Sequence, residues 1–426
     1  MKASVEQISS VKRKISVEIP EDEVVKEVES FYKDLGKKAK IKGFRPGKVP
    51  RNILERYFKD YVKAEVIQKL IEESYPKALS ETELQPVSPP AIDPGEFVGG
   101  KPFQYSAVFE IKPDVKPEGY TGLKLEGKKE EVKDEEVEQR LKALQNLHAN
   151  LTTISEARPI QAGDYVIVDY EAYAEGKPLE GGKATDFTVE VGSGQFIPTF
   201  EEKLIGLNLE EEKEIEVSFP ADYAYQKWAG KTVSFRVKIK EIKAKILPPL
   251  DDEFAKDLGD SSLEDLKAKL KGEIEKEKAL ALEQQLKNQA VDQLIDGNPF
   301  EVPESLVEER AKAMVSDTKL RLAAQGVALK NLGVSEEKLQ GDYRAMAQKQ
   351  VKTFLILEKI ASQEGITVTD EEADGRLKEI SERMHQPFDA VKRYYEKNNL
   401  LPEVKAGILR DKTLNFLLEK ANVEYV

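Results

Sequence analysis

The 426-residue sequence contains no cysteine and only two histidines. Without cysteine the chain cannot form a disulfide, bind a metal through a thiolate or use a thiol as a nucleophile. His148 and His385 lie far apart in the sequence, and no carboxylate spacing around either one indicates a metal site or a Ser-His pair. Both are expected on helix surfaces, and the sequence predicts neither a metal nor a cofactor.

The sequence also lacks the signals of nucleotide and membrane binding. Gly192-Ser193-Gly194 is too short for a nucleotide-binding loop, and the Gly or Lys of the nucleotide fingerprints does not follow it. No apolar run approaches the length of a membrane span, and the first residues contain no apolar signal region. We therefore expect a soluble cytoplasmic protein that neither uses ATP nor binds a membrane.

The chain does contain enough apolar residues for several domains. With 426 residues and a hydrophobic content of 40%, it is too long for one core and is expected to form two to four domains. The net charge is -13, but residues 33–51 hold eight basic side chains and one acidic one, which gives this segment a local charge of +7. Such a basic island attracts a polyanion.

The basic segment contains the loop sequence Gly43-Phe44-Arg45-Pro46-Gly47-Lys48-Val49-Pro50. Its glycines permit backbone angles that are closed to other residues, while its prolines fix φ, so we expect a loop that is shaped before binding. Phe44 would then present a ring that stacks on a base or fills a pocket. An ordinary surface turn is the alternative interpretation, since clusters of basic residues are weak signals.

The first zone, residues 1–115, mixes strand and helix patterns. Ile15–Ile19 and Phe103–Ile111 place apolar residues at every second position, which predicts strands. Acidic residues after Pro20 indicate the start of a helix, and apolar residues recur at helical spacing from Ile67 to Tyr75. The basic loop is therefore expected between two helices of an α+β domain.

Strand signals concentrate in residues 160–245. Phe187–Val191, Ile215–Phe219 and Val233–Ile239 alternate apolar and polar residues, as half-buried antiparallel strands do. A short helix is expected to begin at Pro198 and to lie across the sheet. Eleven of the chain's 32 aromatic residues fall in this zone, more than a small core needs, which predicts that some of them line a pocket.

The other two zones are helical in pattern. Residues 116–159 carry a run of charges and then one apolar helical stripe, which predicts a connector that spaces the domains. Beyond residue 246, long stripes run from Leu263 to Gly297, from Pro303 to Ala324 and from Glu336 to Gln363. Helices this long, with charge on most faces, are expected to extend in part as arms whose clefts hold unfolded segments weakly. Ordinary helix packing is the alternative for most single residues.

The pattern Gly-Phe-Arg-x-Gly-x-x-Pro near the start of an acidic chain resembles the ribosome-attachment signature of the trigger factor family of bacterial nascent-chain chaperones. In that family the Phe-Arg-x-x-Lys positions contact the large ribosomal subunit beside the exit tunnel. The resemblance implies that Phe44, Arg45 and Lys48 make this contact here. It implies a ribosome-binding set of Gly43, Phe44, Arg45, Gly47, Lys48 and Pro50.

The strand-rich zone resembles an FKBP-type prolyl isomerase domain through Gly181-Gly182, the stretch from Val191 to Glu201, Phe219-Pro220 and the closing strand from Val233. On that resemblance the catalytic pocket would be lined by Tyr170, Leu179, Phe187, Phe196, Ile197, Phe200, Tyr223 and Phe235.

Such a pocket needs no nucleophile, because the barrier of about 18 to 20 kcal/mol to rotation about an X-Pro bond comes from lost amide resonance. An apolar site that excludes water favours the less polar, twisted amide. Tyr223 is expected in addition to donate a hydrogen bond to a substrate carbonyl.

Residues 246–426 resemble the C-terminal domain of the trigger factor family in the order and lengths of their expected helices. Taken together, the three resemblances occur in the order of the family and span essentially the whole chain. They predict a multidomain α+β protein: an α+β ribosome-docking domain (1–115), a connector (116–159), an FKBP-like antiparallel sheet with a short helix (160–245) and an all-α chaperone domain with long arms (246–426). The expected partners are the large ribosomal subunit near the exit tunnel and nascent or unfolded polypeptides. A homodimer off the ribosome is left open.

Two other interpretations compete with this one. A free FKBP-type prolyl isomerase, whose helical domains serve only dimerisation or scaffolding, would not associate with ribosomes. An RNA-binding module would bind naked RNA tightly through the basic loop and Phe44. The net charge of -13 argues against the RNA-binding module, because the rest of the surface would repel nucleic acid.

Overall fold

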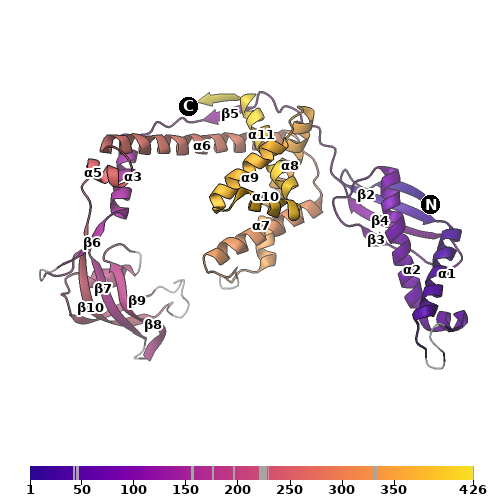
Figure 1. Cartoon of the computed structure of the whole chain (residues 1–426), viewed down its shortest axis with the longest axis horizontal. Helices are drawn as coiled ribbons and strands as arrows, with labels where there is room; N and C mark the ends of the chain where they lie inside the picture. The colour runs from indigo at the N-terminus through magenta and orange to yellow at the C-terminus, as the bar shows by residue number, and fades with distance from the viewer. Residues whose placement is uncertain are drawn as a thin grey trace. The chain divides into compact units, whose positions relative to one another are not determined.

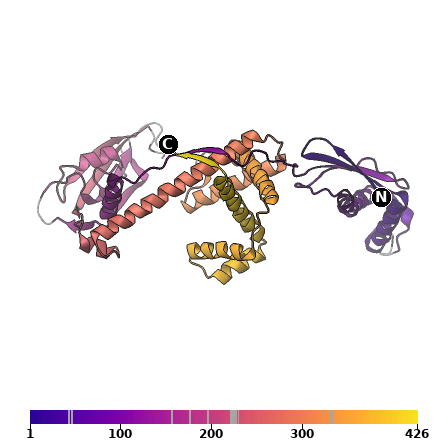
Figure 2. The same cartoon turned by 90° about the horizontal axis from the view of Figure 1, so that it is seen from above.

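The computed structural model of the protein describes residues 1–41, 44, 48–154, 158–174, 177–194, 197–219, 228, 230–329 and 333–425. The chain forms two compact units, whose elements are labelled in Figure 1 and seen from above in Figure 2. One unit contains Met1–Lys128 together with Leu282–Val426, and the other contains Lys129–Ala281. Within the described ranges, no helix combines the length and the apolar content that a membrane span requires.

The N-terminal part of the first unit is a four-stranded antiparallel sheet with two helices packed against it (Figure 1). The sheet order is β1-β2-β4-β3, formed by β1 (Lys2–Gln7), β2 (Lys12–Ile19), β4 (Phe103–Glu110) and β3 (Ala91–Asp93). Strands β2 and β4 contain the two predicted strands, and they pair with Ile15 opposite Ala107. Their buried alternate residues form one core with apolar residues of helices α1 (Glu21–Lys38) and α2 (Arg51–Thr82).

The basic loop joins α1 to α2, as the sequence predicted. Helix α1 carries Lys37 and Lys38 in its last turn, where positive charge suits the negative end of the helix dipole. Helix α2 begins directly after Pro50, whose φ is -61°, the value to which the proline ring restricts the backbone. Both ends of the loop are therefore held by helices.

The second unit contains a five-stranded antiparallel sheet. Its strands are β6 (Asn150–Thr153), β7 (Tyr165–Ala174), β8 (Lys177–Glu190), β9 (Glu212–Ser218) and β10 (Thr232–Ile246). The long strand β10 pairs with β7 along one side and with β9 and then β6 along the other, while β8 pairs with β7. Helix α4 (Pro198–Leu204) buries Phe200 and Leu204 in the core of this sheet, so the predicted short helix is confirmed.

A smaller core in the second unit involves the stretch that the sequence assigned only a spacing role. Helix α3 (Asp134–Leu147) buries Val137 and Leu141 against α5 (Asp252–Asp257) and the first turns of α6 (Leu263–Gly297). The partners are Phe254, Leu266 and Leu270. The apolar stripe of α3 therefore contributes to the stability of the unit.

The rest of the first unit is mainly helical. It contains α7 (Glu304–Ala324), α8 (Glu336–Gln363), α9 (Asp370–Met384), α10 (Phe388–Lys397) and α11 (Leu401–Glu419). The bounds of α7 and α8 agree closely with the predicted stripes. The sequence did not predict the two-stranded parallel sheet in which β11 (Asn422–Tyr425) pairs with β5 (Lys124–Gly127).

Candidate active site and docking loop

Four aromatic side chains from four elements of the second unit form one cluster. The ring of Phe200 on α4 lies 5.3 Å from the ring of Phe235 on β10, centre to centre. The ring of Tyr170 on β7 lies 5.8 Å from that of Phe235 and 5.5 Å from that of Phe187 on β8. All three pairs meet edge to face, the arrangement that the charge distribution of aromatic rings favours.

Strand register explains why two of these rings meet. Strand β10 runs antiparallel to β7, with Val237 opposite Tyr170 and Phe235 opposite Ala172. Tyr170 and Phe235 are therefore diagonal neighbours on one face of the sheet, within reach of each other's rings. Helix α4 supplies Phe200 to the same core.

The predicted pocket residues fall into an inner and an outer group. Phe200 and Phe235 are 0% exposed and Ile197 is 6% exposed, and all three belong to the apolar core of the sheet. Partly buried side chains pack against this core, and they include Tyr170, Leu179 and Phe187. The other two predicted residues, Phe196 and Tyr223, lie outside the described residues.

The hydroxyl of Tyr170 is the polar group of this cluster. Burial raises its pKa above the ordinary tyrosine value, because the charged phenolate is poorly solvated there. The group therefore stays protonated at neutral pH. Its ring meanwhile packs against Phe200 and Phe235.

The sequence favoured a loop position for Trp228, away from the pocket floor, but its ring belongs to the same cluster. Its ring lies 6.0 Å from that of Phe235 and 5.3 Å from that of Phe219, and its side chain packs against the core of the sheet. The only available signal was that Trp228 is the sole tryptophan of the chain.

A partly buried ion pair that the sequence analysis also missed supports the segment before β7. The guanidinium of Arg158 donates two hydrogen bonds of 2.7 and 2.8 Å to the carboxylate of Asp164. The backbone N–H of Gln161 donates a third, of 2.9 Å. The hydrogen bonds from Arg158 are the main reason that the pKa of Asp164 lies below its ordinary value.

The basic loop presents three described side chains of the predicted set at the surface. Phe44 is 38% exposed, and Lys48 and Pro50 are also exposed. The backbone N–H of Phe44 donates a 3.1 Å hydrogen bond to the carbonyl of Ile41, and Pro50 directly precedes α2. Three further members of the set are not among the residues that the structure describes, namely Gly43, Arg45 and Gly47.

Two basic residues of the 33–51 segment are engaged within the protein. Lys37 forms a 2.7 Å ion pair with Asp34. Arg51 donates a 2.8 Å hydrogen bond to Glu55, and its guanidinium lies 4.6 Å from the ring centre of Tyr32. Other described basic side chains of the segment are exposed, namely Lys33, Lys38, Lys40 and Lys48. Arg51 thus anchors the base of the loop, and the exposed lysines provide its positive surface.

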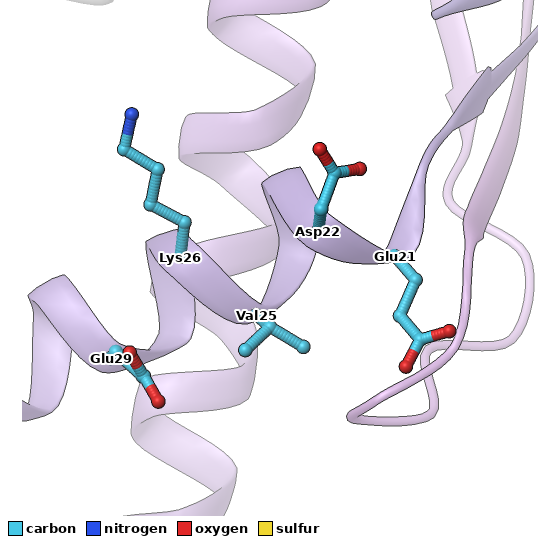
Figure 3. A pocket seen from close by; sticks show the side chains of 5 residues that line it. All are labelled: Glu21, Asp22, Val25, Lys26 and Glu29. Carbon is cyan, nitrogen blue, oxygen red and sulfur yellow. The ribbon is translucent and has the colours of Figure 1, made fainter.

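Helix α1 also carries a shallow pocket on its outer side (Figure 3). The lining side chains all come from this one helix and are Glu21, Asp22, Val25, Lys26 and Glu29. Because a single helix supplies the lining, the pocket has no opposing wall to enclose a ligand. In the described part of the chain, no group of three His, Asp or Glu side chains is placed to hold a metal ion.

Comparison with known proteins identifies the family. Residues 1–144 match the family model of the bacterial trigger factor protein, and residues 262–419 match the model of its C-terminus. The chain belongs to the trigger factor family. Residues 156–240, between the two trigger factor matches, match the model of the FKBP-type peptidyl-prolyl cis-trans isomerase.

Full-length relatives agree with this assignment. The trigger factor of Geotalea uraniireducens is 39% identical over 428 residues, covering 100% of this chain and 99% of the relative. The trigger factor of Geotalea daltonii is 40% identical over 428 residues, covering 100% and 98%. A solved structure of a trigger factor chaperone has a TM-score of 0.55 and 21% identity over 98% of this chain and 99% of that one, which shows a common fold.

These findings confirm the main functional prediction over the free isomerase. The chain is a trigger factor chaperone that carries an FKBP-type peptidyl-prolyl isomerase domain. Trigger factors are ribosome-associated chaperones that act on nascent chains.

Proposed function

We propose that the protein docks on the large ribosomal subunit beside the exit tunnel through Phe44, Arg45 and Lys48. The observation that carries this proposal is an exposed Phe44 and Lys48 in a basic loop between two helices, in a chain of net charge -13. A local positive surface is attracted to phosphates, and an exposed ring can stack on a base or enter a pocket. Gly43, Gly47 and Pro50 complete the proposed ribosome-binding set.

We propose the following division of labour. Residues 1–115 dock on the ribosome, and residues 116–159 connect this domain to the next. Residues 160–245 isomerise X-Pro bonds. Residues 246–426 hold nascent and unfolded polypeptides in a cradle of long helices. The site of action is the cytoplasm, where ribosomes translate. Off the ribosome, sedimentation velocity would distinguish a monomer from the homodimer that the sequence analysis left open.

We propose that the aromatic cluster is the site of isomerisation. The floor of Phe200, Phe235 and Ile197 excludes water and offers no competing hydrogen bonds, which favours the twisted amide over the planar one. Tyr170, Leu179 and Phe187 would contact the substrate at the rim, together with Phe196. Tyr170 and Tyr223 supply hydroxyls that can donate to a substrate carbonyl.

Replacing Phe44, Arg45 and Lys48 with alanine tests the docking proposal. We expect the full-length variant to lose co-sedimentation with large ribosomal subunits and to keep its thermal unfolding temperature, because exposed loop side chains bury little surface.

A matched control replaces Arg393, Tyr394 and Lys397 of α10 with alanine. This change also removes one exposed aromatic ring and two positive charges, and it should leave sedimentation intact. A loop variant that still co-sediments with large ribosomal subunits as the unmodified protein does would contradict the docking proposal. Equal losses in both variants would mean that overall charge, rather than this loop, drives the association.

A further inference from the structure

One buried carboxylate binds the backbone of the loop that leads into the proposed isomerase site. Glu201 lies in the first turn of α4 and is 1% exposed. Its Oε2 atom accepts hydrogen bonds from the backbone N–H of Gly192 at 3.0 Å and of Gly194 at 2.8 Å. It also lies 3.4 Å from the hydroxyl oxygen of Ser193. A buried carboxylate is stable only when hydrogen bonds replace those it would make to water. The N–H groups of the loop therefore stabilise the Glu201 carboxylate, and the carboxylate in turn holds the loop.

The conformation of the loop explains why its N–H groups converge. Gly192 and Gly194 have φ of 88° and 70°, in the left-handed region that glycine enters without steric cost. Backbone N–H groups in such turns can point to one side and create a small anion-binding concavity. Here the anion is supplied by the protein itself. The start of the loop is held separately, since Val191 donates a 2.9 Å backbone hydrogen bond to the carbonyl of Asp164.

Gly194 and Glu201, which a hydrogen bond joins, flank in the sequence the two residues that line the proposed site. The segment from Gly194 to Glu201 contains Ile197 and Phe200, which are 6% and 0% exposed. It also contains Phe196, which the resemblance places in the pocket wall. One oxygen atom therefore connects the loop before this segment to the helix at its end.

We infer that Glu201 is a positioning residue of the prolyl isomerase: its carboxylate sets the placement of Ile197 and Phe200 against the substrate. The inference rests on the proposed location of the active site in the aromatic cluster. Glu201 does not need to touch the substrate. Without its oxygen, the backbone N–H groups of Gly192 and Gly194 lose this acceptor, and the loop is held less tightly against α4.

The expected effect follows from the sensitivity of catalysis to placement. A displacement of about 1 Å in a catalytic surface can cost about a hundredfold in rate. We therefore expect Glu201→Ala to lower kcat/KM for a proline-containing tetrapeptide by between about tenfold and a hundredfold. Glu201→Gln should retain kcat/KM close to that of the unmodified protein, because the amide oxygen can accept the same N–H groups.

The experiment compares four full-length variants in the peptide isomerisation assay, and measures hydrogen exchange of the loop and of β10 in each. Glu201→Asp keeps the charge but withdraws the oxygen by one methylene, so it should fold and still lose activity. Glu202→Ala is the matched control, since Glu202 is the exposed neighbour on α4, and its activity should be unchanged.

Several results would overturn the inference. One is full activity in a folded Glu201→Ala or Glu201→Asp variant. Another is an equal loss in Glu201→Gln and Glu201→Ala, accompanied by faster exchange throughout β10, since that pattern marks a purely structural role. If Glu201→Ala fails to fold, the activities of Glu201→Asp and Glu201→Gln test whether Glu201 is a positioning residue.

The location of the active site is tested separately by Phe200→Ala. If that variant stays folded and fully active, the proposed site is misplaced, whatever the Glu201 variants do. If Phe200→Ala is inactive and folded while the Glu201 variants are all active, only the positioning inference fails.

Discussion

Phe200 shows how a single side chain connects the stability of the isomerase fold to its proposed activity. It has no exposed surface and touches the rings of Phe235 and Tyr170. We expect Phe200→Ala to destabilise the domain by about 3 to 5 kcal/mol and to remove most of the peptide isomerase activity of the chain at a temperature where it remains folded.

The control for this prediction is Ile242→Ala. Ile242 is also buried, at 4% exposure, but it lies on β10 well beyond Phe235. Its truncation should cost about 2 to 5 kcal/mol and leave the activity of the folded protein intact. Full activity in folded Phe200→Ala would contradict the proposed site.

Protonation of Asp164 should make the second unit less stable at acid pH. Its folded-state pKa is lowered, so the ion pair with Arg158 contributes stability above the unfolded pKa of about 3.9, and this contribution is lost as pH falls through the folded value. We expect Asp164→Asn to lower the free energy of unfolding at pH 7 by about 1 kcal/mol or more. The difference from the unmodified protein should shrink as pH falls below about 4.

The measurement is denaturant unfolding of both proteins across this pH range. A difference that stays constant from neutral to acid pH would show that hydrogen-bond geometry, and not charge, accounts for the contribution of Asp164.

At the scale of elements, α9 is attached to its neighbours largely through ion pairs. Asp370 and Glu372 in its first turn pair with Lys405 and Lys412 of α11 at 2.6 and 2.7 Å. Asp374 pairs with Lys392 of α10 at 2.7 Å. The helix buries only a narrow stripe of three residues, Ala373, Leu377 and Ser381. Exposed pairs of this kind are individually weak and are screened by salt.

We therefore predict that salt loosens α9 and α10 before the rest of the helical part. Raising the ionic strength from about 0.05 to 0.5 M shortens the Debye length from about 14 Å to about 4 Å. Amide exchange in α9 and α10 should accelerate several-fold over this range. Helix α8 is the internal control, because it buries Leu355, Ile356 and Ile360 in an apolar core. An equal acceleration in α8, or none in α9, would contradict the prediction.

At the scale of the whole molecule, isomerisation and chaperone activity should be separable. The β-sheet that carries the aromatic cluster has its own core, distinct from that of the C-terminal helices. Deleting residues 161–244 and joining the flanks should abolish peptide isomerisation. It should leave suppression of aggregation largely intact, including for a client without proline, because flexible clients bind through many weak apolar contacts.

The measurement is light scattering from a denatured, proline-free client diluted into buffer with the unmodified or the shortened chain. Circular dichroism checks that the shortened chain remains helical. A folded deletion variant that suppresses scattering no better than buffer would refute the prediction that the two activities are separable. It would indicate that chaperone activity requires the isomerase sheet.

The sequence by itself determined the features that adjacent residues encode. Alternation of period two located β2, β4 and β10, and apolar stripes of helical period located α6, α7 and α8 almost to the residue. These patterns are legible because each side chain's face follows from its position within one element. The positive charge, glycines and prolines of the basic loop are also features of adjacent residues, and the resemblance to the family rests on them.

Only the tertiary structure decided which distant residues meet. The diagonal contact of Tyr170 with Phe235 depends on strand register. Trp228 packs against Phe235 across the fold, and a turn brings Glu201 within 2.8 Å of the backbone N–H of Gly194. The pairing of β11 with β5 joins segments about 300 residues apart. A buried carboxylate or a short strand has no periodic signal of its own, because its stability comes from partners that only the folded chain brings into contact.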